Sequence, residues 1–113
     1  MRTQARIASV LVLLALAPQW AYCGDTAGTV TELLVLSDFP DRVFLRVGGS
    51  NSQLPACSTV GNRYVLDTST NTGKQLYALL LAAKYANTSI TAIGLGTCNF
   101  VSNSEDLRGV VQN

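Results

Sequence analysis

Residues 42–47 show the clearest alternation of apolar and polar side chains in the chain. A period of two is typical of a β-strand with one buried face. The apolar face carries Val43, Leu45 and Val47, and the other face carries Arg42, Phe44 and Arg46. The preceding segment 29–36, which Gly28 opens, is rich in β-branched and aliphatic residues and predicts another strand. Because Pro40 is placed for a turn between the two segments, we expect them to form a hairpin.

Three later segments also have the composition of short strands. They are 57–67 with a bulge at Gly61, 89–96, and 106–112 with a weak point or bulge at Gly109. The segment 48–56, which is rich in glycine and serine, predicts a flexible loop before the first of them. The sequence therefore predicts five short strands in a single domain.

Between the third and fourth strand segments the apolar period becomes that of a helix. This helix is expected to begin near residues 70–72, where threonine and asparagine can cap it, and to end near Asn87. Its core-facing stripe is Leu76, Leu79, Leu80 and Ala83. Three strands, a helix and two strands is the order of an OB-fold, a mainly β, five-stranded Greek-key barrel. A generic α+β sandwich is the alternative that this pattern leaves open.

The first 23 residues have the features of a cleaved signal peptide. Two arginines precede an apolar core at residues 7–18, and small side chains at Ala21 and Cys23 stand at the −3 and −1 positions before Gly24. An uncleaved membrane anchor, or a lipoprotein signal with an acylated Cys23, are the alternatives. Cleavage would leave residues 24–113 as a single OB-fold-like domain that is secreted or periplasmic.

The cysteine and histidine content narrows the chemistry that the chain can perform. Cys57 and Cys98 remain after cleavage, in a compartment that permits disulfides. The chain has no histidine, which removes the usual general base for a cysteine nucleophile and the commonest metal ligand. A Cys57–Cys98 disulfide is therefore the simplest interpretation, and it would close a loop of about 40 residues. We expect a non-catalytic protein with no metal and no cofactor.

The charge balance disfavours nucleic acid and anionic membranes as partners. The chain as a whole has a formal net charge of +1, but loss of the first 23 residues leaves six basic residues against seven acidic ones. The mature net charge is then −1, and no basic run survives to bind phosphates.

The predicted helix is apolar around more of its circumference than one core contact requires. Residues 76–83 include no charged side chain. A helix of this kind usually makes a second contact. We therefore expect self-association, or docking onto a larger secreted subunit, through Tyr77, Ala78, Leu81 and Tyr85. The alternative is a monomer that tolerates these side chains at its surface.

Several of these segments together resemble a family of small secreted bacterial proteins. The similar parts are residues 28–36, 64–84 and 90–98, and the most specific motifs are Asp-Thr-Ser-Thr-x-x-Gly-Lys at 67–74 and Gly-x-Gly-Thr-Cys at 94–98. The chain resembles the subtilase-cytotoxin B-subunit-like group. That resemblance implies an OB-fold with a disulfide. Its pentameric toxin members also imply binding of sialylated glycans on host cells.

A candidate ligand site follows from the expected fold. OB-folds bind ligands on the barrel face and in the loops that join strands one to two and four to five. In this chain those loops and their edges supply Phe39, Arg42, Asn99, Phe100 and Asn103. Aromatic rings can pack on the C–H face of a sugar, while amides and a guanidinium bond its hydroxyls or a carboxylate. The alternative is ordinary loop chemistry, with the two phenylalanines plugging the barrel ends.

The acidic residues do not indicate catalysis. Glu105 and Asp106 are adjacent, and neighbours in a strand point to opposite faces, so they cannot flank one glycosidic bond. We expect them to form a solvated strand start, and we expect Asp67 to cap the approach to the helix. The sequence favours a secreted binding domain for cell-surface glycans. The second hypothesis is a periplasmic or envelope accessory protein that binds another polypeptide.

Overall fold

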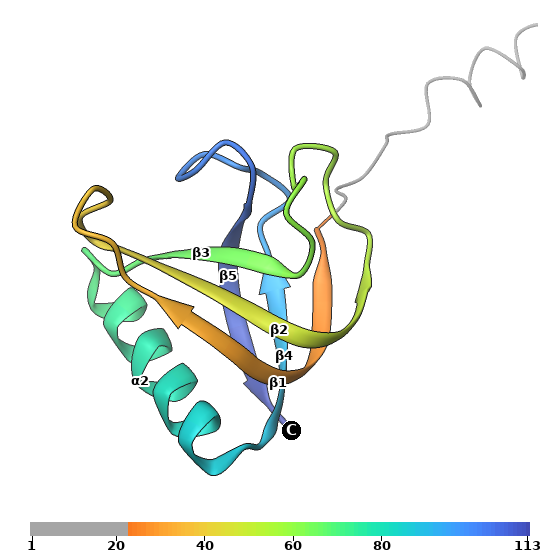
Figure 1. Ribbon diagram of the computed structural model, residues 1–113, viewed down its shortest axis with the longest axis vertical. Coiled ribbons are helices and arrows are strands. Elements are labelled where there is room, and N and C mark those ends of the chain that lie inside the picture. The colour runs from red at the N-terminus through yellow and green to blue at the C-terminus, as the bar shows by residue number, and fades with distance from the viewer. Residues whose placement is uncertain (1–22) are drawn as a thin grey trace, which may run out of the picture.

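The computed structural model describes residues 23–113 (Figure 1). The predicted signal peptide, apart from Cys23, lies outside the described residues. The described chain forms five strands and one helix: β1 (Asp25–Leu34), β2 (Arg42–Ser52), β3 (Arg63–Asp67), α2 (Asn71–Ala86), β4 (Ser89–Gly94) and β5 (Glu105–Gln112). The helix lies between β3 and β4, as the sequence predicts.

The five strands form one closed barrel in the order β1-β2-β3-β5-β4, and β4 pairs with β1 to complete the ring. All pairs are antiparallel except β3 with β5, which run parallel over a short stretch. This is the strand order of a five-stranded Greek-key barrel. The OB-fold prediction is therefore confirmed, and the alternative of an α+β sandwich is wrong because the strands form a single closed sheet.

Several predicted strand boundaries are wrong. β1 covers Asp25–Leu34 instead of residues 29–36, and β4 ends at Gly94 instead of residue 96. Two other differences are larger. The segment 48–52, predicted as part of a loop, extends β2 and pairs with the first half of β1. Glycine and serine are poor strand formers, but ladder hydrogen bonds come from the backbone, which any residue supplies. Residues 57–62, predicted as strand, form turns instead, and the amides of Thr59 and Val60 bond to the carbonyl of Asn103. The bulge predicted at Gly61 is therefore wrong as well.

The irregularity predicted at Gly109 is confirmed. Ile93 lies opposite Gly109, and Gly94 lies opposite Leu107, so Arg108 is an extra residue on β5. One unpaired residue in an antiparallel ladder is a β-bulge, which bends the strand and increases its twist.

The barrel core is aliphatic, with Tyr64 as its largest member. The inward face of β2 supplies Val43, Leu45 and Val47, as its alternation predicts. From the helix, Leu80 and Ala83 are buried, and Leu76 and Tyr77 pack against the same cluster. The inclusion of Leu79 in the core stripe is wrong, because its side chain is 41% exposed. Successive residues of a helix are about 100° apart around its axis, so Leu79 is turned away from the core face that holds Leu80. Tyr77 packs against the core in its place.

Both ends of α2 are capped as predicted. Thr70 is the N-cap, and its hydroxyl accepts a hydrogen bond of 3.0 Å from the Gly73 amide. Asn87 is the C-cap in a left-handed conformation. A Cβ at Gly73 would overlap the Asp67 carbonyl. The 67–74 motif therefore acts here as a helix start packed closely on the end of β3.

Candidate functional site

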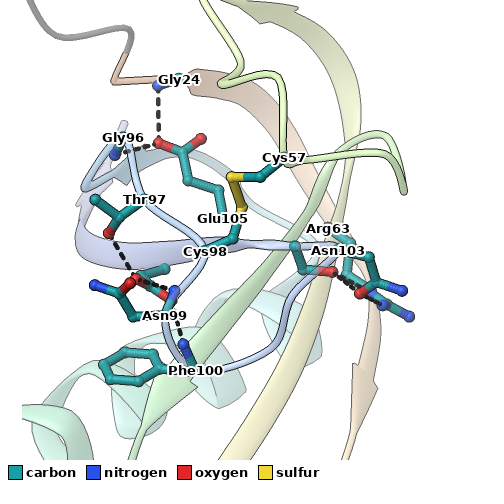
Figure 2. The surroundings of a disulfide bond; sticks show 12 residues. Gly24, Cys57, Arg63, Gly96, Thr97, Cys98, Asn99, Phe100, Asn103 and Glu105 are labelled. Carbon is teal, nitrogen blue, oxygen red and sulfur yellow. Dashed lines mark hydrogen bonds between the residues drawn. A yellow bond between two sulfur atoms is a disulfide. The ribbon is translucent and has the colours of Figure 1, made fainter.

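A disulfide between Cys57 and Cys98 joins two loops at one end of the barrel (Figure 2). Its S–S distance is 2.07 Å and its Cα–Cα distance is 6.2 Å. One cysteine lies in the loop that precedes β3, and the other lies in the β4–β5 loop (residues 95–104). The predicted disulfide is confirmed, so the cysteine after the Gly-x-Gly turn is a structural residue.

Within residues 23–113, no group of three or more potential ligand side chains is arranged to hold a metal ion. No helix in this described part of the chain has the length and apolar character needed to cross a membrane.

The prediction that Glu105 and Asp106 form a solvated strand start is wrong. Glu105 is fully buried and Asp106 is 1% exposed. Their opposite orientation is confirmed by their different partners: Glu105 bonds to Gly24 and Gly96, and Asp106 bonds to the following part of the β4–β5 loop. Two adjacent acids can be buried because each receives several hydrogen bonds from backbone or hydroxyl donors.

Asp106 fixes the conformation of the β4–β5 loop. Its carboxylate accepts hydrogen bonds from the Thr97 hydroxyl at 2.6 Å, the Asn99 amide at 2.9 Å and the Phe100 amide at 2.9 Å (Figure 2). Backbone donors that converge on one ionised acid make strong bonds, because the acceptor carries a full charge. The positions of Asn99 and Phe100 are therefore set by a buried residue of β5.

The predicted ligand residues lie on or beside one outward-facing part of the barrel, which two loops partly cover. We call it the outer β2–β3 face and define it by the outward positions of the two strands: Arg42, Phe44, Arg46, Arg63, Val65 and Asp67. The β1–β2 loop (residues 35–41) and the β4–β5 loop contribute side chains to this face. Both loops are the ones through which OB-folds commonly bind ligands.

Arg42 connects the face to the β4–β5 loop. Its guanidinium lies 4.7 Å from the centre of the Phe100 ring, and its Nη1 donates to Asp67 Oδ1 at 3.0 Å. The pKa of Asp67 is lowered, first because the Ser69 amide donates to its carboxylate and then because Arg42 is close. The expected capping role of Asp67 is thus confirmed at the turn into α2.

Phe39 and Arg63 enclose Phe44 on the same face. The rings of Phe39 and Phe44 meet edge to face at 5.5 Å, and the Arg63 guanidinium lies 5.2 Å from the Phe44 centroid. Arg63 also donates to Asn103 Oδ1 at 2.7 Å and to the Ser104 hydroxyl at 2.7 Å. Phe44 is therefore 3% exposed, whereas Phe39 keeps 39% of its surface exposed.

All five predicted site residues are associated with this one face. Phe39 reaches it through Phe44, Arg42 belongs to it, Phe100 packs on Arg42, and Asn103 bonds Arg63. Asn99 precedes Phe100 in the loop that Asp106 orders. Neither Phe39 nor Phe100 belongs to the core cluster or to the side chains packed against it, so the two rings do not plug the barrel ends. Ordinary loop chemistry stays the alternative interpretation of these residues.

Sequence reasoning missed Phe44 and Arg63 as site residues. The alternation of 42–47 already placed Phe44 beside Arg42 on the outer face. Arg63 could be found only from the barrel order, which puts β3 next to β2 and aligns Arg63 with Arg46. The position of Arg63 therefore follows from the strand order of the barrel and not from the pattern of its own strand.

The arginines of the face differ in their charge partners. Arg42 is paired with Asp67, whereas Arg46 faces Glu32 in the register of β1 and β2 without forming an ion pair with it, and its Nε is buried without a hydrogen-bond partner in the part of the chain that the structure describes. The hydrogen-bond partners of Arg63 are instead neutral groups of Asn103 and Ser104. Arg63 therefore keeps a positive charge that an anionic ligand can use.

The surface of α2 that is predicted to contact a partner contains a groove. A groove of about 460 Å³ is lined by Leu33, Tyr77, Leu81, Lys84 and Tyr85. Three of the four residues predicted to contact a partner line this groove; the fourth, Ala78, is exposed on the helix but does not. Tyr85 is 90% exposed. Tyr77 also packs against the core, so its apolar surface is partly covered by the chain itself.

Comparison with protein-family models, with curated proteins and with solved structures finds no match for this chain.

Proposed function

We propose that the protein is a secreted, non-catalytic binding domain whose outer β2–β3 face recognises an anionic saccharide. One observation carries this proposal: aromatic rings and guanidinium groups from two loops and two strands lie together on a single face. The disulfide agrees with an oxidising compartment, where cell-surface glycans are found. The resemblance to toxin B subunits supports the same ligand class.

The chemistry of the face suits a sugar acid better than a neutral sugar. The partly exposed Phe39 ring offers a flat apolar surface for C–H groups. The neighbouring Arg63 offers a carboxylate the guanidinium donors that Ser104 and Asn103 leave free. Because the loop amides of Asn99 and Phe100 are held by Asp106, the site is largely formed before a ligand arrives. Such preorganisation reduces the entropic cost of binding.

The first test is a glycan array probed with the mature protein, followed by titration calorimetry with the strongest saccharide. We expect sialylated or other carboxylated glycans among the hits. Phe39→Ala and Arg63→Ala should each weaken binding by about tenfold or more, because each removes roughly 1.4 kcal/mol or more of contact energy.

Matched controls are available for both variants. Val35→Ala removes an exposed apolar side chain from the same region as Phe39, and Arg108→Ala removes an exposed arginine from β5. Both controls should bind like the wild type. An array without carboxylated hits, or equal loss of affinity in the controls, would contradict the proposed site.

A second candidate function is self-association through the α2 groove. The groove and the projecting Tyr85 belong to the same surface, so a two-fold pair of chains could place each Tyr85 against the groove of the other. This arrangement would use the residues that the sequence singled out, and a larger secreted subunit is the other partner that the sequence suggests.

Light scattering at micromolar concentration tests the second candidate. We expect a mass that is a multiple of the mature chain, and Tyr85→Ser should shift it to that of one chain because it removes the projecting ring. Leu79→Ser is the control, since Leu79 is 41% exposed on α2 but does not line the groove. A wild type that remains a single chain would contradict self-association.

A further inference from the structure

Glu105 occupies an unusual position at the start of β5. Its side chain is fully buried, and its Oε2 accepts hydrogen bonds from the Gly24 amide at 3.0 Å and the Gly96 amide at 2.8 Å (Figure 2). The other oxygen, Oε1, has no hydrogen-bond partner within residues 23–113. A buried carboxylate oxygen without a partner is costly and calls for an explanation.

The surroundings of Glu105 are built around its carboxylate. A Cβ at Gly94 would overlap the carboxylate, and a Cβ at Gly24 would lie 2.5 Å from Oε1 and 2.6 Å from Leu54 Cδ2. Gly96 has a φ of 80°, a left-handed conformation that favours glycine. The Gly-x-Gly turn before Cys98 therefore makes room for an acid and supplies one of its donors.

The ionisable groups that influence Glu105 are all acidic. Asp106 and Asp25 raise its pKa in addition to the larger effect of burial, and the Tyr64 side chain faces the same interior. The one ion pair in residues 23–113 is Arg42–Asp67, so Glu105 has no cationic partner in the described chain. A positive charge close to such an acid favours its ionised form.

We propose that hydrolysis of the Cys23–Gly24 peptide bond is a maturation step that supplies this charge, because the new α-ammonium of Gly24 pairs with Glu105. A protease of the signal-peptidase class adds one water across the bond. The C–N bond breaks, Cys23 keeps the new carboxylate, and the Gly24 nitrogen becomes an amine that takes up a proton.

Two independent observations meet at this bond. The sequence places small residues at Ala21 and Cys23 before Gly24, which is the pattern of a cleavage site. The structure places the nitrogen of the same glycine 3.0 Å from a buried carboxylate. An amide has one N–H, whereas an α-ammonium has three, so cleavage supplies both the missing donor for Oε1 and a countercharge. The inference does not depend on saccharide binding.

Cleavage adds a second titrating group, the α-ammonium of Gly24, whose contribution to stability persists to higher pH than that of Glu105 in the uncleaved chain. In the uncleaved chain the pKa of Glu105 is raised, so its stabilising contribution is complete below the ordinary glutamate value and is lost as the pH rises through the raised value. An ion-paired α-ammonium has a raised pKa as well. The contribution of the ammonium to the stability of the fold is complete below the ordinary pKa of an α-amine, near 8. It is lost only as the pH rises through the raised pKa.

The experiment uses protein secreted from the full-length precursor. Intact mass and N-terminal sequencing should show Gly24 as the first residue. The pKa of its amine, measured without chemical modification from the ¹³Cα and ¹³C′ shifts of Gly24 in uniformly ¹³C-labelled protein across a pH series, should lie above about 9 rather than near 8. Burial alone would lower that pKa, so the direction of the shift distinguishes an ion pair from simple enclosure. The exposed Lys74 serves as an internal reference.

Two variants keep the test decisive. Glu105→Gln preserves the shape and removes the charge, so the amine pKa should fall to its ordinary value or below. One alanine inserted between Cys23 and Gly24 keeps Cys23 at the −1 position but moves the ammonium one residue away, and this should return the amine pKa to about 8 even if Glu105→Gln does not fold. A mature chain that starts elsewhere, including at an acylated Cys23, would overturn the proposal. A wild-type amine pKa at or below about 8 would do the same.

Discussion

Replacing both Cys57 and Cys98 with alanine is expected to lower the free energy of unfolding by about 3–4 kcal/mol. The disulfide spans 41 residues, and without it the unfolded chain regains the freedom of that loop. For a domain of this size the melting temperature should fall by roughly 15–25 °C. Thermal unfolding followed by circular dichroism measures the change.

A reducing agent provides the matched control for that variant. Wild-type protein unfolded in dithiothreitol should melt near the temperature of the double variant, and the double variant should not respond to the reagent. The bridge also holds the loop before β3 against the β4–β5 loop, where Thr59 and Val60 bond Asn103. Saccharide affinity should therefore decrease together with stability. A double variant as stable as the wild type would show that the barrel does not need this link.

Asp106→Asn is expected to destabilise the fold on the order of 2–4 kcal/mol, although the two side chains have the same shape. The wild-type carboxylate accepts from one hydroxyl and two loop amides while it is 1% exposed. An asparagine removes the charge and directs an NH₂ group toward N–H donors, so at least one buried amide loses its acceptor. Urea unfolding of the two proteins measures the difference.

Amide hydrogen exchange locates the effect of Asp106→Asn. The amides of Asn99 and Phe100 should lose protection first, because they donate directly to Asp106. Asp38→Asn is the control: Asp38 is an exposed acid in the β1–β2 loop, and its replacement should change stability by less than about 0.5 kcal/mol. Unchanged exchange at residues 99 and 100 would mean that the loop is ordered by other contacts.

The sequence was informative where a local signal determines the structure. The alternation of 42–47 assigned the inner and outer faces of β2 correctly, and Thr70 and Asn87 marked the ends of α2 to within a residue. The cysteine count and the absence of histidine predicted the disulfide. Each of these inferences depends on residues that are adjacent, or on an elimination that needs no geometry.

The sequence was misleading where residues far apart decide the environment. Glu105 and Asp106 look like a solvated acidic pair, yet both are buried. Their hydrogen-bond donors lie 6–9 residues away in the sequence or, for Gly24, 81 residues away. The 48–52 segment has the composition of a loop, but β1 provides a partner for its backbone. The place of Arg63 in the candidate site emerges only when β2 and β3 are known to be neighbours.

Chemical-shift mapping tests the central claim, that the outer β2–β3 face is a saccharide site, most directly. The ¹⁵N-labelled mature protein would be titrated with a sialylated oligosaccharide and its amide resonances followed. Saturable shifts should cluster in the β1–β2 loop, in β2 and β3 near Arg42 and Arg63, and in the β4–β5 loop around Phe100, while α2 stays unchanged. Shifts confined to the α2 groove, or no saturable shift with any carboxylated saccharide, would contradict the account.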